Sequence, residues 1–556
     1  MAATQSPTSL LPTLIALATI LYIIGVALYR LYFHPLAKYP GPFWAKLTQW
    51  PEAQSSWRGR RHLDLHAMHE KYGDVVRLAP NSLAFRTPGA IHDIYTDRNA
   101  NVIKTGWTET ARKLNPYPSS QVISDRKLHA ARRKLLNQAF SVSAINSMEQ
   151  YVLKTIRTWC EYLQEPPAVE AAPNKGDKAT GGWSRERDIA VWSNLLTLDV
   201  LGELCFGASF GAMKAGRTYI ADLVLGSGRM ILVLSSLPIR DLLMPILKRP
   251  ALAKIVGGDM SRKRIRFREE MGVLVEKRTA LERVNAEKPA EEQRKDFFHY
   301  LLHAQDPETG VKFVPKELVG EAGLLVAAGS DTSSATMSAF LFNMLHNERV
   351  YKKVQQEVRS AFDEVEEIKY TAKLSGLPYL RACIDETLRI APPVPGYLAR
   401  VILPGGAVID GNTYPAGTVV GTGAYSIHHN ANLFEKPFSY IPERWIVGSS
   451  DEDPSVPIKV TKSSVQVAKD SFWAFSSGPR VCVGKGMAYM ELSITLARLI
   501  WLFDIRFAPG HERSGGGGPG KGDGRERENE YQLTDAFVSD RSGPVLQFKR
   551  RLVDEF

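Results

Sequence analysis

The segment FSSGPRVCVG at residues 475–484 places one cysteine where its sulfur could take part in chemistry. At average residue frequencies, its pattern of spacing arises by chance in about one chain in ten thousand of this length. A long apolar run, MAYMELSITLARLIWLF, follows it directly and predicts a buried helix. The pattern is Phe-x-x-Gly-x-Arg-x-Cys-x-Gly, and its residues are Phe475, Gly478, Arg480, Cys482 and Gly484.

Each element of this pattern has a physical role if Cys482 ligates a heme iron. The thiolate would donate electron density to the iron, and the N-terminus of the following helix would stabilise its negative charge. Gly478 and Gly484 would let the backbone turn and lie close to the porphyrin, where a Cβ would collide. Arg480 would pair with a heme propionate through its planar guanidinium. A buried structural cysteine, the alternative, needs neither the glycines nor the arginine.

The other cysteines and the charge of the chain narrow the class of protein. Cys160, Cys205 and Cys383 are widely spaced, without the paired spacing of disulfides or zinc sites, and indicate reduced thiols in a cytosolic environment. The net charge of +11 suits an anionic membrane surface or an acidic partner. Because there is no zinc-finger spacing and no arginine-rich arm, we expect no nucleic-acid partner.

The N-terminus predicts a membrane anchor. The 20 residues from Leu10 to Tyr29 are mostly apolar, enough for a helix that crosses about 30 Å of hydrocarbon. A signal peptide is the competing interpretation, but the apolar run is longer than a signal core and no cleavage site follows. The predicted divisions are a luminal leader (1–9), an anchor (10–30), a proline-rich hinge (31–48) and one domain (49–556), with disordered insertions predicted at 165–182 and 514–530.

The body of the chain shows mainly helical periodicity with a smaller strand component. We therefore expect a mainly α fold with a minor β part. Long amphipathic stretches lie at 126–140, 316–346 and 485–504, and strand patterns lie near 73–85, 407–423 and 542–551.

The cysteine loop resembles the heme-binding signature of the cytochrome P-450 superfamily, the heme-thiolate monooxygenases. Further matches follow in the expected order along nearly the whole body. The resemblance implies the cytochrome P-450 fold after one transmembrane helix, with heme b (iron protoporphyrin IX) as the cofactor and Cys482 as its axial iron ligand. It also implies that Glu386, Arg389 and Arg444, in ETLR and PERW, form a buried structural triad.

Two further segments match helices of the family that flank the heme. LLVAAGSDTSSAT (324–336) resembles the distal helix, so Thr332 would hold a water and Asp331 would help to pass protons. A small-residue contact between helices is the alternative. DRKLHAARRKLLNQAFS (125–141) resembles the propionate-binding helix, where His129 replaces the usual tryptophan and Arg133 keeps the arginine. Arg400 would supply another propionate contact, and an ordinary surface histidine is the alternative for His129.

By the same resemblance, substrate contacts come from segments that are mostly apolar or small, which implies a lipophilic substrate. Arg112 and Lys113 could hold a substrate carboxylate, although a solvated loop is the better interpretation of that stretch. The segments are 106–124, the helix around Ala327 and Ala328, 394–398 and 535–539.

Together these features predict a monooxygenase that inserts one oxygen atom from O2 into a lipophilic small molecule by hydroxylation or epoxidation. No flavin or iron–sulfur module fits, so electrons would come from a separate NADPH-cytochrome reductase. The segments YFHPLAKYPGP and SIHHN resemble filamentous-fungal members of secondary metabolism, with a single anchor in the endoplasmic reticulum membrane and a cytoplasmic catalytic domain. Two alternatives stay open: a same-fold enzyme that rearranges or dehydrates its substrate without O2, and a non-catalytic heme sensor.

Overall fold

The computed structural model describes residues 7–165, 182–216, 219–249, 252 and 258–551. Helices make up most of its body, as the mainly α prediction requires. The helices are α1 Pro7–Leu28, α2 Phe43–Leu47, α3 Trp50–Arg58, α4 Arg61–Tyr72, α5 Pro88–Ile91, α6 Trp107–Leu114, α7 Arg126–Ala139, α8 Val142–Leu163, α9 Ile189–Phe206, α10 Ala212–Ala215, α11 Tyr219–Ser236, α12 Arg240–Leu247, α14 Gly258–Ala286, α15 Phe297–His303, α16 Pro315–Leu345, α17 Glu348–Ala361, α18 Ala372–Ser375, α19 Pro378–Ile390, α20 Ala424–His428, α21 Ser449–Glu452, α22 Lys462–Ser471 and α23 Lys485–Leu502.

The strands form small sheets at the edges of the helical body. The largest has five strands in the order β1-β2-β8-β5-β3, in which only β2 and β8 pair in parallel. A second has the order β4-β12-β9, and β6-β7 and β10-β11 are hairpins. The strands are β1 Val75–Ala79, β2 Ser82–Phe85, β3 Val102–Lys104, β4 Arg187–Asp188, β5 Arg400–Ile402, β6 Ala407–Ile409, β7 Asn412–Tyr414, β8 Val419–Thr422, β9 Phe503–Phe507, β10 Thr534–Ala536, β11 Val538–Asp540 and β12 Val545–Arg550.

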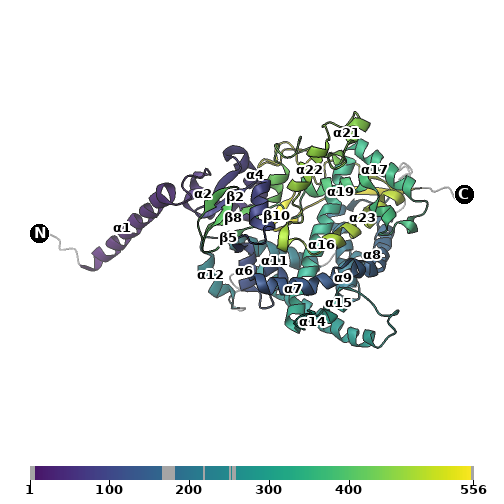
Figure 1. Cartoon of the computed structure of the whole chain (residues 1–556), viewed down its shortest axis with the longest axis horizontal. Helices are drawn as coiled ribbons and strands as arrows, with labels where there is room; N and C mark the ends of the chain where they lie inside the picture. The colour runs from purple at the N-terminus through teal and green to yellow at the C-terminus, as the bar shows by residue number, and fades with distance from the viewer. Residues whose placement is uncertain (1–6, 166–181, 217–218, 250–251, 253–257, 552–556) are drawn as a thin grey trace, which may run out of the picture.

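The long helix α16 runs through the middle of the body, and α9 packs along it (Figure 1). Gly329 stands at this contact. A Cβ at Gly329 would lie 3.0 Å from Cδ2 of Leu201 on α9, closer than nearly all real Cβ contacts. The glycine therefore lets α9 approach α16, and the small-residue contact considered from the sequence is present.

The apolar helix α1 projects from one end of the molecule, beside the five-stranded sheet (Figure 1). Leu11–Phe33 has the length and hydropathy to span a membrane and is not buried by the rest of the chain. Ile189–Phe206 passes the same test, but 83% of it is buried, so it is a core helix. The N-terminal helix thus fits a membrane anchor.

The predicted hinge is packed against the body. Leu36 lies in one apolar cluster with Leu83 and Phe85 of β2. The buried Arg77 donates its backbone N–H to the Pro40 carbonyl at 2.7 Å and its Nη1 to the Arg30 carbonyl at 2.8 Å. The chain from Arg30 onward is therefore held by the sheet instead of standing away from it.

The structure differs from the sequence prediction of disorder at residues 514–530. Backbone hydrogen bonds hold the segment, such as Gly517 N to the Glu530 carbonyl at 3.2 Å and Gln532 N to the Gly515 carbonyl at 2.9 Å. Gly515 has a φ of +85°, where glycine is favoured. The prediction of disorder relied on the low apolar content of the segment, whereas backbone hydrogen bonds hold this loop. Nearly all of the other predicted insertion, 165–182, lies outside the described residues.

Deletion of residues 2–27 should release the protein from membranes without loss of stability, because Arg30 and the packed segment after it remain. Deletion of residues 2–40 should release it as well but lower the free energy of unfolding by about 2–5 kcal/mol, because the buried Leu36 and the acceptors of Arg77 are lost. Membrane sedimentation and chemical denaturation of both proteins measure these effects. Equal stability of the two deletions would show that the 28–40 segment contributes nothing to the fold.

Candidate functional site

The cysteine loop is held between a short 3-10 turn, Gly478–Arg480, and the N-terminus of α23. The Cys482 N–H donates to the Phe475 carbonyl at 3.0 Å and closes the loop. Burial raises the pKa of the Cys482 thiol, whereas hydrogen bonds from the Gly484 and Lys485 backbone and the charge of Arg133 oppose this rise. The sulfur thus has the donors that a thiolate needs at a helix N-terminus.

Cys482 lines a cavity of about 340 Å³, which we call the cysteine cavity. Its walls come from α7, α9, α16 and α23 together with the cysteine loop. Apolar side chains form most of the wall, and basic groups form one side. The residues that line it include Lys104, His129, Arg133, Arg400, Arg480, Trp473, Phe475, Gly484, Thr332, Leu324 and Ala328.

All four basic groups predicted from the sequence reach this cavity. Arg133 donates Nη1 to the Val481 carbonyl at 2.6 Å, and Arg480 donates Nη1 to the Ile123 carbonyl at 2.7 Å. Burial and then Arg400 lower the pKa of Arg480 to about 10. Burial, with Arg480 next, lowers the pKa of His129 to about 3, so its imidazole is neutral and buried. The surface alternative for His129 is therefore excluded.

Lys104 is a member of this group that the sequence reasoning missed. Its Nζ donates to the Gln121 carbonyl at 2.7 Å, and burial, followed by Arg400, Arg480 and Arg133, holds its pKa well below the usual range. In the described part of the chain, no carboxylate lies within ion-pair distance of these basic side chains. A lone lysine at a strand end gives no sequence signal of its own.

A further unpartnered donor lines the cysteine cavity. Nε1 of Trp473 is buried without a hydrogen-bond partner among the described residues, and the tryptophan is 3% exposed. Buried donors of this kind are normally satisfied, so a ligand acceptor is expected here. An apolar cavity with a thiol, converging cations and a free N–H fits a heme, whose propionates are anions and whose iron takes a thiolate ligand.

The two glycines of the signature differ in position. Gly484 lines the cysteine cavity, and a Cβ there would make ordinary contacts at 3.8 Å with Phe140. Gly478 does not line it in the described structure. Its φ is +65°, and a Cβ would lie 2.1 Å from the Tyr95 carbonyl oxygen. Gly478 is thus required for the loop to cross Tyr95, which corrects the predicted approach to the porphyrin.

Thr332 and Asp331 point to different surroundings, although they are neighbours on α16. Thr332 lines the cysteine cavity and donates Oγ1 to the Ala328 carbonyl at 2.7 Å. Asp331 lies away from that cavity and accepts from Asn194 Nδ2 at 2.9 Å. Burial raises the pKa of Asp331 to about 6, opposed by Arg541 and the Asn194 amide.

The three charged residues assigned to a triad are in contact and buried. Arg389 donates Nε and Nη2 to the two Glu386 oxygens at 2.9 and 2.8 Å, and Arg444 Nε lies 3.4 Å from Glu386 Oε1. Burial alone raises the pKa of Glu386, but the two arginines outweigh it and hold the pKa below the usual value. The triad joins α19 to the Pro442–Trp445 turn, apart from the cavity lining.

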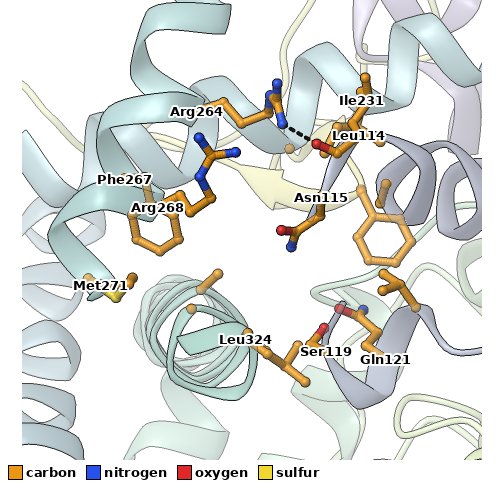
Figure 2. Close-up of a pocket in the computed structure, with 18 of the residues that line it drawn as sticks. Leu114, Asn115, Ser119, Gln121, Ile231, Arg264, Phe267, Arg268, Met271 and Leu324 are labelled. Atoms are coloured by element: carbon orange, nitrogen blue, oxygen red, sulfur yellow. Dashed lines mark hydrogen bonds between the residues drawn. The ribbon is translucent and has the colours of Figure 1, made fainter. Parts of the chain in front are cut away.

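A second cavity of about 190 Å³, the α14 cavity, adjoins the cysteine cavity (Figure 2). Gln121, Leu324, Ala328, Phe537 and Val538 line both. Most of the segments expected to contact substrate contribute to these walls. Arg112 and Lys113 do not line the α14 cavity, and Lys113 instead pairs with Glu109 at 2.8 Å.

Comparisons with known proteins agree with this geometry. The family model for Cytochrome P450 matches residues 36–514. The chain is similar to Cytochrome P450 monooxygenase fscF of Fusarium equiseti, with 35% identity over 96% of each chain. It is similar to Cytochrome P450 monooxygenase apf7 of Gibberella fujikuroi, with 35% identity over 98% of each, and to Cytochrome P450 monooxygenase AKT7 of Alternaria alternata, with 34% over 97% of each.

Lys104→Met should speed heme loss by about tenfold, because it removes a donor from the basic group that we expect to face the propionates. The rate of heme transfer to apomyoglobin measures this, without any need for turnover. Lys127→Met, which removes an exposed lysine of α7, is the matched control and should not change the rate. Equal rates in both variants would exclude Lys104 from the propionate site.

Proposed function

This chain belongs to the cytochrome P450 family and is a heme-dependent monooxygenase, and we propose that it hydroxylates or epoxidises a lipophilic small molecule. The observation that carries this proposal is the cysteine cavity, where a thiol, a set of unpaired cations and the Thr332 hydroxyl face one apolar space. The adjoining α14 cavity offers mostly apolar walls for a substrate. When bound, the heme would supply the iron at which O2 is activated.

We assign the cofactor contacts residue by residue. Cys482 would be the axial ligand, with the Gly484 and Lys485 N–H groups holding its negative charge. Phe475 packs on Tyr489 at a ring distance of 5.2 Å and would shield the sulfur from water. The propionates would accept from the basic group and from Trp473 Nε1. That group comprises Lys104, His129, Arg133, Arg400 and Arg480.

We propose that Thr332 and Asp331 supply protons to the reacting oxygen. Thr332 Oγ1 is in the cysteine cavity, and its present bond to the Ala328 carbonyl leaves the oxygen able to accept from a water. Asp331 has a pKa of about 6, so it exchanges its proton readily near neutral pH. An intact acid and alcohol favour oxygen insertion over the alternative of an O2-independent rearrangement.

The remaining parts of the proposal concern electrons and location. A separate NADPH-cytochrome reductase would supply electrons, because monooxygenases of this family take electrons from a redox partner. The helix α1 would anchor the protein in the endoplasmic reticulum membrane, with residues 1–9 luminal and the domain cytoplasmic. The fungal origin of the similar monooxygenases supports a role in fungal secondary metabolism.

Cys482→Ser should remove the thiolate while leaving the packing of the loop intact. The reduced, CO-bound wild type should show the red-shifted Soret band that a thiolate trans to CO produces, and the variant should lack it. Absorption spectra of both proteins at matched heme content measure this. A variant that keeps the band would assign the iron ligand to another residue.

Thr332→Ala should leave heme content nearly unchanged but lower the product formed per NADPH consumed, with more hydrogen peroxide released. The reason is that the hydroxyl positions a proton donor and does not support the fold. Assays of NADPH, product and peroxide in a reconstituted system with reductase and O2 measure the coupling. Turnover that persists without O2 would support the rearrangement chemistry instead, and unchanged coupling would exclude the role given to Thr332.

A further inference from the structure

The helix α14 directs two arginines into the α14 cavity. Arg264 and Arg268 are four residues apart on one face, and both line the cavity. Figure 2 shows their guanidinium groups on one side of the open space and Leu324, Ser119 and Gln121 on the other. Charged side chains of a helix usually point to solvent, so this inward pair needs a reason.

Neither arginine has a carboxylate within ion-pair distance among the described residues. Arg264 donates Nη1 to the Leu114 carbonyl at 2.7 Å, while its Nε is buried and has no partner. Burial, with Arg268 next, lowers the pKa of Arg264. On the same helix, Arg266 lies 3.7 Å from Glu270 and is exposed. The inward pair therefore differs from its neighbour in having no carboxylate partner among the described residues.

The rest of the cavity has a few polar side chains among mostly apolar ones. Asn115 places an amide on the side of the guanidinium groups, whereas Ser119 and Gln121 lie across the open space. The other walls lead to residues shared with the cysteine cavity. These walls include Leu114, Phe267, Met271, Leu324, Ala327, Ala328 and Phe537. The Phe537 ring stacks on the Trp107 ring, with 4.0 Å between the ring centroids, and closes one side of the cavity.

We propose that the substrate carries a carboxylate, which Arg264 and Arg268 bind while its apolar body extends past Leu324 and Ala328 toward Thr332. This assignment rests on the proposed monooxygenase function and names the substrate class for that site. Burying an unpaired guanidinium is costly, and an anionic ligand offsets the cost. The planar fork of arginine matches a carboxylate in two parallel hydrogen bonds.

A carboxylate fits the cavity better than a phosphate. Arg264 keeps one nitrogen on the Leu114 carbonyl, whereas Arg268 makes no hydrogen bond to another described residue. The carboxyl of Asp331 also lines the cavity and would repel a dianion more than a monoanion. Arg112 and Lys113, the residues considered for this role from the sequence, lie outside the cavity lining.

The test measures binding of matched acids and esters to the full-length holoenzyme. Decanoic, dodecanoic and tetradecanoic acids, their methyl esters and dodecyl phosphate are titrated while the heme absorption shift is recorded. We expect at least one acid to bind about tenfold more tightly than its ester. The ratio of the ester Kd to the acid Kd should fall close to one in Arg268→Gln and should stay at the wild-type value in Arg266→Gln. Because partition of each probe into detergent is the same for every variant, comparison of the ratio between variants cancels it.

Arg264→Gln should lower the ratio as well, but Arg268→Gln decides the matter because Arg268, unlike Arg264, makes no hydrogen bond to a carbonyl among the described residues. The proposal is overturned if no acid binds more tightly than its ester, if Arg268→Gln keeps the ratio, or if dodecyl phosphate binds more tightly than the acid. If the CO-bound Soret band is normal but acid and ester bind equally tightly, only the proposal of a carboxylate substrate is rejected. Loss of that band in the wild type would reject the heme-thiolate function.

Discussion

The gathering of desolvated cations at one side of the cysteine cavity is the constraint on which the site depends. Burial lowers the pKa values of Lys104, Arg133, Arg400 and Arg480, and none of them forms an ion pair with a described carboxylate. They come from β3, α7, β5 and the cysteine loop, so the fold must bring four separate elements together at the cost of desolvating their charges. An anionic cofactor offsets that cost, which couples heme binding to the stability of the assembled protein.

Close packing at two glycines lets the elements around the cysteine cavity approach one another. Gly478 lets the cysteine loop cross the Tyr95 carbonyl, and Gly329 lets α9 press on α16. The buried Glu386 triad fixes α19 to the turn at Arg444, and removal of one partner would leave an uncompensated charge. These contacts lie away from the sulfur, yet they set where the sulfur and Thr332 stand relative to each other.

The two adjoining cavities divide the chemistry of the protein. The cysteine cavity has its cations, Trp473 Nε1 and the thiol, and the α14 cavity has its own unpaired arginines beside apolar walls. Both use α16 as a shared wall, through Leu324 and Ala328. A molecule held by its polar end at Arg268 would therefore be positioned by α16 near the Thr332 hydroxyl.

By itself the sequence determined the cysteine loop, the mainly α fold and the apolar N-terminal helix, because these depend on local spacing and periodicity, and its resemblance to a known family identified the triad. It did not determine that Lys104 lies with the other cations, that Gly478 lets the loop cross the Tyr95 carbonyl, or that backbone hydrogen bonds hold residues 514–530. In the sequence, Arg264 and Arg268 do not differ from the other charged residues of a polar helix. Only the tertiary structure decided these points, because a side chain's surroundings are set by distant elements that pack against it, and local sequence carries no record of them.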